Sequence, residues 1–320
     1  MLIYTLKRIL QSIPVIIGVA IIGFILLHLL PGGPARAIIG TNHPSPAKIA
    51  ALNHQLGLDK PLVEQFLIWF FNLIRGHLGQ SYVQNTSVAN LLAENLPQTL
   101  WLIGLSLVIS LILAIPVAIY QATHRNRFGD HLLTAVNLFL FAMPSFWLGL
   151  LLIIWFGIDL RWFPVGGIVN SNASGLFPVL LSRLHHMFLP ALVLALGSVA
   201  GWSQYLRSSV LDAITQDYVR TARAKGVAER VVLYKHILRN SLITVISLIG
   251  LSLPALVGGA VIIENVFNYP GMGLLYVQSA EQYDFPPMLA LIVIIAVFTV
   301  AGNLLADLLY AAADPRVRFD

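Results

Sequence analysis

The residue patterns that carry hydrolytic chemistry are missing from this sequence. No glycine-rich loop ends in Gly-Lys-Ser/Thr, so the chain has no signal for binding the phosphates of ATP. The HExxH motif of zinc hydrolases and the GxSxG motif of serine hydrolases are also absent. His185 and His186 form a tempting metal pair, but adjacent side chains on a helix diverge by about 100°. We therefore expect no catalytic residue and no metal site.

Polar residues inside apolar runs are the next candidates, because burying them in a membrane is costly. Asn303 and Asp307 are four residues apart and share one face of a helix. Gln204 lies near the end of another apolar run. Such residues either line a solute pathway or form hydrogen bonds between helices, and for Asn303 and Asp307 we favour the hydrogen bonds.

The longest polar stretch is DYVRTARAKGVAERVVLYKHILRN, residues 217–240, which lies between two apolar runs. Six Lys and Arg residues dominate it. Residues 218–225 are good helix formers, and Gly226 suits the left-handed turn that ends a helix. A second helix is expected to start near Ala228 and to continue into the next apolar run.

The first of these helices is expected to be amphipathic and to enter a groove of a partner protein, presenting Tyr218, Val219 and Ala222 among basic residues. An ordinary positive loop that only sets membrane topology is the alternative.

Composition identifies the class of protein. The 320 residues are 58% hydrophobic and only 10% charged, with a mean hydropathy of +0.81, which is typical of an integral membrane protein. The chain has no cysteine, so disulfides and thiolate metal sites are excluded. Its basic residues are divided between the two sides of the membrane, not gathered on one face, so we expect no nucleic-acid partner.

The apolar runs predict one all-helical transmembrane domain, residues 1–320, with six spans. The spans are expected at about residues 9–30, 99–120, 132–157, 189–206, 241–263 and 287–311. Residues 31–98 form an outer excursion, in which a helix starting at Asp59 and Pro61 and continuing to Arg75 is expected to lie in the membrane interface. Pro144 predicts a kink early in the third span.

The distribution of positive charge predicts the orientation. With both chain ends inside, the inner segments hold 13 of the 19 Lys and Arg residues, although the outer segments are about twice as long. An excess of Lys and Arg marks the cytoplasmic side. Both termini and residues 207–240 are therefore expected in the cytoplasm.

Four ordered motifs resemble the permease subunits of ABC importers, in the dipeptide, oligopeptide and nickel branch (dipeptide permease B type). They are DYVRTARAKGV with KHILRN, ENVF leading to YPGMG (residues 264–273), NLLADLLY (303–310) and DPRVR (314–318). The resemblance implies the type I ABC importer permease fold, with residues 207–240 as the coupling loop that docks on an ATP-hydrolysing subunit.

The resemblance also assigns candidate roles to residues. The coupling residues that it implies are Asp217, Tyr218, Val219, Arg220, Thr221, Ala222, Arg223, Ala224, Lys225 and Gly226. The outer-gate residues that it implies, near the mouth of the pathway, are Glu264, Phe267, Tyr269, Pro270 and Gly273. A simple reverse turn between two spans is the alternative for this second stretch.

The implied function is ATP-driven import of di- or oligopeptides by alternating access across the bacterial cytoplasmic (inner) membrane. The resemblance implies a second homologous permease, two ABC ATPase subunits that bind ATP and Mg²⁺, and an extracytoplasmic binding protein. Nickel, metallophores and glutathione-like solutes remain open as cargo. An autonomous secondary transporter would need an internal repeat or charged residues at mid-membrane, and neither is clear; an intramembrane enzyme is least favoured.

Overall fold

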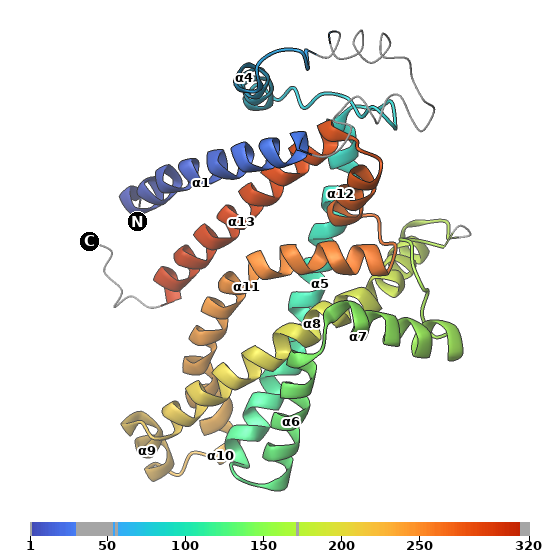
Figure 1. Cartoon of the computed structure of the whole chain (residues 1–320). Helices are drawn as coiled ribbons and strands as arrows, with labels where there is room; N and C mark the ends of the chain where they lie inside the picture. Colours follow the sequence, from blue (N-terminus) through green and yellow to red (C-terminus); the bar gives the residue numbers. More distant parts are fainter. Residues whose placement is uncertain (1, 30–53, 55–56, 171–172, 314–320) are drawn as a thin grey trace. The chain divides into compact units, whose positions relative to one another are not determined.

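The computed structural model describes residues 2–29, 54, 57–170 and 173–313, and every regular element in this part of the chain is a helix (Figure 1). The described residues form two compact units. Unit 1 contains residues 100–269 and both ends of the chain, and unit 2 contains residues 6–99 and 270–300. Two parts of the sequence analysis fall outside the described residues: the DPRVR motif, and most of the outer excursion that precedes Gly57.

Four helices are long and apolar enough to cross a membrane. They are α1 (Leu2–His28), α5 (Val88–Thr123), α8 (Leu176–Ile214) and α13 (Phe285–Ala313). Two further pairs of helices are also long and apolar enough when each pair is taken together, but each pair is sharply bent. The described residues therefore contain up to six spans if each bent pair crosses the membrane once. Helices α5 and α8 extend well beyond the predicted spans at 99–120 and 189–206.

The third predicted span, 132–157, is not one helix. Helix α6 (Phe128–Ala142) ends at Met143, and α7 (Ser145–Leu152) starts after Pro144 and continues as a π-helical turn, Ile153–Asp159. The angle between the two parts is 104°, and Figure 1 shows α7 turning away from α6. Pro144 forces Met143 out of the helical region into an extended conformation (ψ 128°), so the expected kink is a complete break.

Helix α8 forms the centre of unit 1 and packs against α6, α7 and α11 (Arg239–Val266). Two hydrogen bonds join these helices. Asn137 Nδ2 donates to Ser203 Oγ at 2.8 Å in a buried contact, and Trp202 Nε1 donates to Ser252 Oγ at 2.9 Å in a partly buried one. Polar side chains often join membrane helices in this way. Helix α11 also bends, by 54°, at Pro254.

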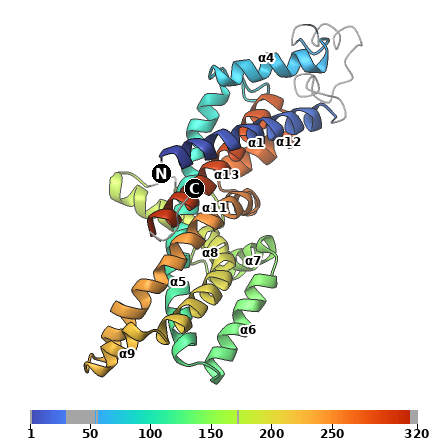
Figure 2. The same cartoon turned by 90° about the vertical axis from the view of Figure 1, so that its left-hand side faces the viewer.

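Unit 2 is built from α1, α4 (Leu62–Ile74), the first turns of α5, α12 (Met272–Glu281) and the first half of α13. Helices α1 and α13 lie side by side in both views (Figures 1 and 2), and Phe24 of α1 packs against Phe285 and Met288 of α13. The helix predicted between Asp59 and Arg75 is confirmed as α4. The simple reverse turn considered between the last two spans is wrong, because residues 264–284 contain the whole of α12.

Candidate functional site

Helix α9 (Asp217–Ala224) is the short helix that the polar stretch predicts, and it lies beyond the end of α8 (Figures 1 and 2). Its C-terminus is closed by two hydrogen bonds, from Gly226 N–H to Arg223 C=O at 2.9 Å and from Val227 N–H to Ala222 C=O at 3.2 Å. This pattern is a Schellman motif, which needs a left-handed residue at Gly226. The φ of Gly226 is +74°, as the sequence predicts.

The two apolar residues of α9 point into the protein, which corrects the expectation that they face a partner. Val219 is 0% and Ala222 is 7% exposed. They join a core formed by the C-terminal ends of α5 and α8 and by the π-helical segment Val232–Leu238, called η2. The other fully or largely buried members of this core are Ala118, Ala122, Leu206, Val210, Ala213, Val232, Ile237 and Val245. We call this set of residues the coupling core.

The opposite face of α9 is open to solvent. Tyr218, which is 38% exposed, belongs to it; the other exposed residues from 217 to 226 are Asp217, Arg220, Thr221, Arg223, Ala224, Lys225 and Gly226. The sequence could not settle which face is open, because an eight-residue amphipathic helix can bury its apolar pair against its own chain or against another. Here its own chain supplies the apolar partners.

Charges on this surface are only partly paired. Arg223 donates two hydrogen bonds to the carboxylate of Glu229, at 2.6 and 3.2 Å, and these lower the pKa of Glu229. Both side chains are well exposed, so the pair adds only about 0 to 1 kcal/mol. Lys225 has no ion pair in the described part of the chain, and the surface around α9 remains basic.

A buried polar cluster adjoins the coupling core, and sequence reasoning missed it. Arg207 of α8 donates from Nη2 to Oδ2 of Asp130 in the first turn of α6, at 2.8 Å. Asp130 also accepts a hydrogen bond from the backbone N–H of Asn126, and Gln121 of α5 donates to Thr134. Asp130 Oδ1, Gln121 Oε1 and Arg207 Nε have no partner among the described residues. We call Gln121, Asp130 and Arg207 the inner polar cluster.

The outer-gate candidates are divided between the two units. Glu264, Phe267 and Tyr269 are in unit 1 and are completely or almost completely buried, with Phe267 and Tyr269 in the main core of that unit. Burial, reinforced by the Glu264 carboxylate and partly offset by Arg183, raises the pKa of Tyr269. Pro270 and Gly273 belong to unit 2, where Gly273 is buried in α12.

A close backbone approach holds the end of α11 in place. Gly167 N–H donates to the carbonyl of Asn268 at 3.4 Å, and a Cβ atom at Gly166 would lie 2.6 Å from the carbonyl oxygen of Phe267. Only glycine fits at such a distance. Glu264, Phe267 and Tyr269 are therefore packed inside unit 1 and do not form an open loop.

The remaining sequence candidates do not converge on one site. Asn303 and Gln204 are exposed and Asp307 is half-buried. The rings of His185 and His186 donate to the backbone carbonyls of Trp162 and Ser182, both at 2.7 Å. No group of three or more potential metal ligands occurs among the described residues.

Comparison with known proteins identifies the class to which this geometry belongs. Residues 114–319 match the family "Binding-protein-dependent transport system inner membrane component", and residues 1–103 match its N-terminal companion, "Binding-prot-dependent transport system membrane comp, N-term". The chain belongs to this family. It is thus a multi-pass permease subunit of an inner-membrane transport system that works with a binding protein.

Two relatives cover the full length of the permease. The oligopeptide transport system permease protein AppB of Bacillus subtilis (strain 168) is 40% identical over 317 residues, 99% of each chain. The glutathione transport system permease protein GsiC of Escherichia coli (strain K12) is 38% identical over 319 residues, 100% of each chain.

A solved structure supports the predicted fold of the permease. A chain of the MetNI methionine ABC transporter, in an inward-facing conformation, superimposes with a TM-score of 0.52 at 14% identity, covering 68% of this chain and 96% of that one. At this identity the likeness concerns the fold alone. The permease has the all-helical type I ABC importer fold that its motifs predict.

Proposed function

We propose that this permease subunit carries di- or oligopeptides inward by alternating access and that α9 transmits the motion of ATPase subunits to the spans. The observation that carries the proposal is the two-faced character of α9. Its inner face is anchored by Val219 and Ala222 in the coupling core, and its outer face is free to bind. Because α5 and α8 supply that core, a force on α9 acts directly on two of the longest helices.

The cargo is proposed from the relatives. AppB is named for oligopeptides and GsiC for glutathione, and both kinds of solute contain peptide bonds. Nickel complexes and glutathione-like solutes are the alternatives within the same family.

The partners are proposed as a second homologous permease, two ABC ATPase subunits and an extracytoplasmic binding protein. ATP and Mg²⁺ would bind in the ATPases, since the sequence of this chain has no phosphate-binding loop motif, and ATP hydrolysis would take place there and not in this chain. Both termini and α9 would lie in the cytoplasm, as the excess of Lys and Arg in the inner segments supports.

Reconstitution tests this function. The permease would be placed in liposomes with its partner permease, its ATPases and its binding protein, and uptake of tri-leucine, glutathione and Ni²⁺ would be measured with and without ATP. We expect uptake of tri-leucine only with ATP and the binding protein. Uptake without ATP would instead favour an autonomous secondary transporter, and uptake of Ni²⁺ alone would replace the peptide assignment.

We also propose that Glu264, Phe267 and Tyr269 act in the outer gate as a packed hinge at the end of α11. Tyr269 is buried, so a label there would disrupt the core, whereas Asn265 in the last turn of α11 is exposed. Asn265→Cys, in a chain with no native cysteine, should change its labelling rate with a maleimide when ATP is trapped in the complex. The same rate in both states would remove the gating role.

A further inference from the structure

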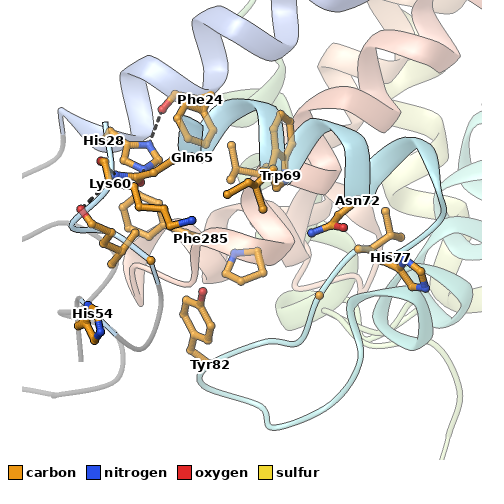
Figure 3. A pocket seen from close by; sticks show the side chains of 17 residues that line it. Phe24, His28, His54, Lys60, Gln65, Trp69, Asn72, His77, Tyr82 and Phe285 are labelled. Atoms are coloured by element: carbon orange, nitrogen blue, oxygen red, sulfur yellow. Dashed lines mark hydrogen bonds between the residues drawn. The ribbon is translucent and has the colours of Figure 1, made fainter. Parts of the chain in front are cut away.

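Unit 2 contains a cavity of about 550 Å³ that the transport mechanism proposed above does not use. Helix α4, the end of α1, the loop that includes Tyr82 and the start of α13 line it (Figure 3). Its size falls within the roughly 300–1,000 Å³ typical of small-molecule sites. All of its lining residues belong to unit 2.

Aromatic rings form the wall of this cavity. Phe24, Trp69 and Phe285 line it, and the ring centroids of Phe24 and Trp69 are 5.6 Å apart. Aromatic walls of this kind suit an apolar side chain, because they offer a large contact area and cost little conformational entropy.

Two polar groups in the cavity are free to bind a ligand. Figure 3 shows the amide of Asn72 and the hydroxyl of Tyr82 directed toward the space between α4 and the Tyr82 loop, and neither side chain has a hydrogen-bond partner in the described part of the chain. The backbone N–H of Tyr82 donates to the buried carboxylate of Asp284 at 2.9 Å, which holds the loop in place. Burial and this carboxylate raise the pKa of Tyr82, so its hydroxyl stays protonated and can donate.

The charges beside the cavity are largely compensated. Lys60 pairs with Glu64 at 2.8 Å, and His54 lies 2.7 Å from Asp59. The site therefore offers little net charge to an ionic ligand, and its recognition chemistry is an apolar wall with polar groups beside it, among them the amide of Asn72 and the hydroxyl of Tyr82. That combination matches an apolar residue of a peptide, whose backbone carries both a donor and an acceptor.

We propose that this cavity binds an apolar side chain of a short peptide, with Asn72 and Tyr82 hydrogen-bonded to the adjoining peptide group. The inference rests on the proposed function, in which peptides are the transported solutes. It assigns to this permease a selectivity for apolar peptides that acts in addition to the binding protein.

The test uses the purified complex of both permeases and both ATPases, without the binding protein. The probe is a tripeptide with leucine at each end and photoreactive benzoylphenylalanine in the middle, competed by tri-leucine or tri-serine. We expect adducts on α4 or on the Tyr82 loop. Displacing the probe should take a concentration of tri-serine at least about tenfold higher than that of tri-leucine, because tri-serine lacks the apolar area that the wall would bury.

Two substitutions remove the polar contacts with little change in shape. Tyr82→Phe keeps the ring and the backbone bond to Asp284, and Asn72→Leu keeps the approximate volume. Each should weaken binding of tri-leucine about 2- to 10-fold, the effect of losing one hydrogen bond. Tyr234→Phe, which removes an exposed hydroxyl in unit 1, is the matched control and should bind tri-leucine like the wild type.

Adducts outside the cavity, or equal affinities in Tyr82→Phe, Asn72→Leu and the control, would overturn the proposal. Measuring the uptake of tri-leucine by the complete system, with the binding protein added, distinguishes a failure of the cavity assignment from a failure of the proposed function. If wild-type vesicles import tri-leucine while the cavity variants bind it normally, only the cavity assignment is wrong. If wild-type vesicles import no peptide, the proposed function fails and the assignment of a peptide to the cavity fails with it.

Discussion

Gly226 is the residue at which backbone conformation decides the end of α9. Its φ of +74° is in the left-handed region, yet a Cβ atom there would meet no other atom within 4 Å. The position therefore selects glycine for its backbone freedom and not for lack of space. A left-handed conformation costs an ordinary L-residue about 1–2 kcal/mol.

Gly226→Ala should destabilise the end of α9 by about that amount and reduce copurification of the ATPase subunits. Gly226→Asn is the matched control, because asparagine tolerates the left-handed region better than alanine. We expect the melting temperature of the purified permease to fall in the order Gly, Asn, Ala. An alanine variant as stable as the wild type would mean that the Schellman motif does not control this helix end.

Thr221 and Ala222 are adjacent in sequence but belong to opposite faces of α9. Ala222→Trp should overpack the coupling core, at a cost of about 1–3 kcal/mol or more, and lower the melting temperature of the permease alone. Thr221→Trp adds the same bulk on the exposed face, so it should leave stability unchanged and block ATPase docking. Equal effects of the two variants on stability and on copurification would contradict the orientation of α9.

At the scale of elements, the inner polar cluster ties the start of α6 to α8 beside the coupling core. Removing one partner of a buried ion pair costs about 3–5 kcal/mol, because a charge is left uncompensated. The side chain of Arg207 is 24% exposed, whereas that of Asp130 is 3% exposed, so solvent can still reach the guanidinium. The loss on removing Asp130 should therefore lie at the lower end of that range.

Asp130→Asn should lower the melting temperature and raise the number of ATP molecules hydrolysed per peptide imported, because α6 is no longer held to α8. The double exchange Asp130→Arg with Arg207→Asp should recover part of both losses. Arg125→Gln, in the same inner loop, is the control for charge alone. If Asp130→Asn keeps the normal ratio of hydrolysis to uptake, the pair has no part in coupling.

At the scale of the whole molecule, the distribution of positive charge predicts that α9 and both termini lie in the cytoplasm. A reporter fused after Asp320 should lie in the cytoplasm, and one inserted at Asn170 should lie outside, because Lys and Arg are concentrated in the inner segments. Alkaline phosphatase and green fluorescent protein fusions measure the two locations. A cytoplasmic signal at Asn170 would show that the bent pair α6–α7 enters and leaves on the same side.

Much of this protein could be predicted from the sequence, because composition, charge and helix ends are local properties. Its apolar content predicts membrane helices, and the residues before Gly226 predict α9 almost to the residue. Tertiary structure decided the rest. Whether Val219 and Ala222 face a partner or their own chain depends on how α9 folds back onto the end of α8 and on α5, which lies far away in sequence. The pairing of Asp130 with Arg207 depends in the same way on how α6 packs against α8, and no local pattern encodes that contact.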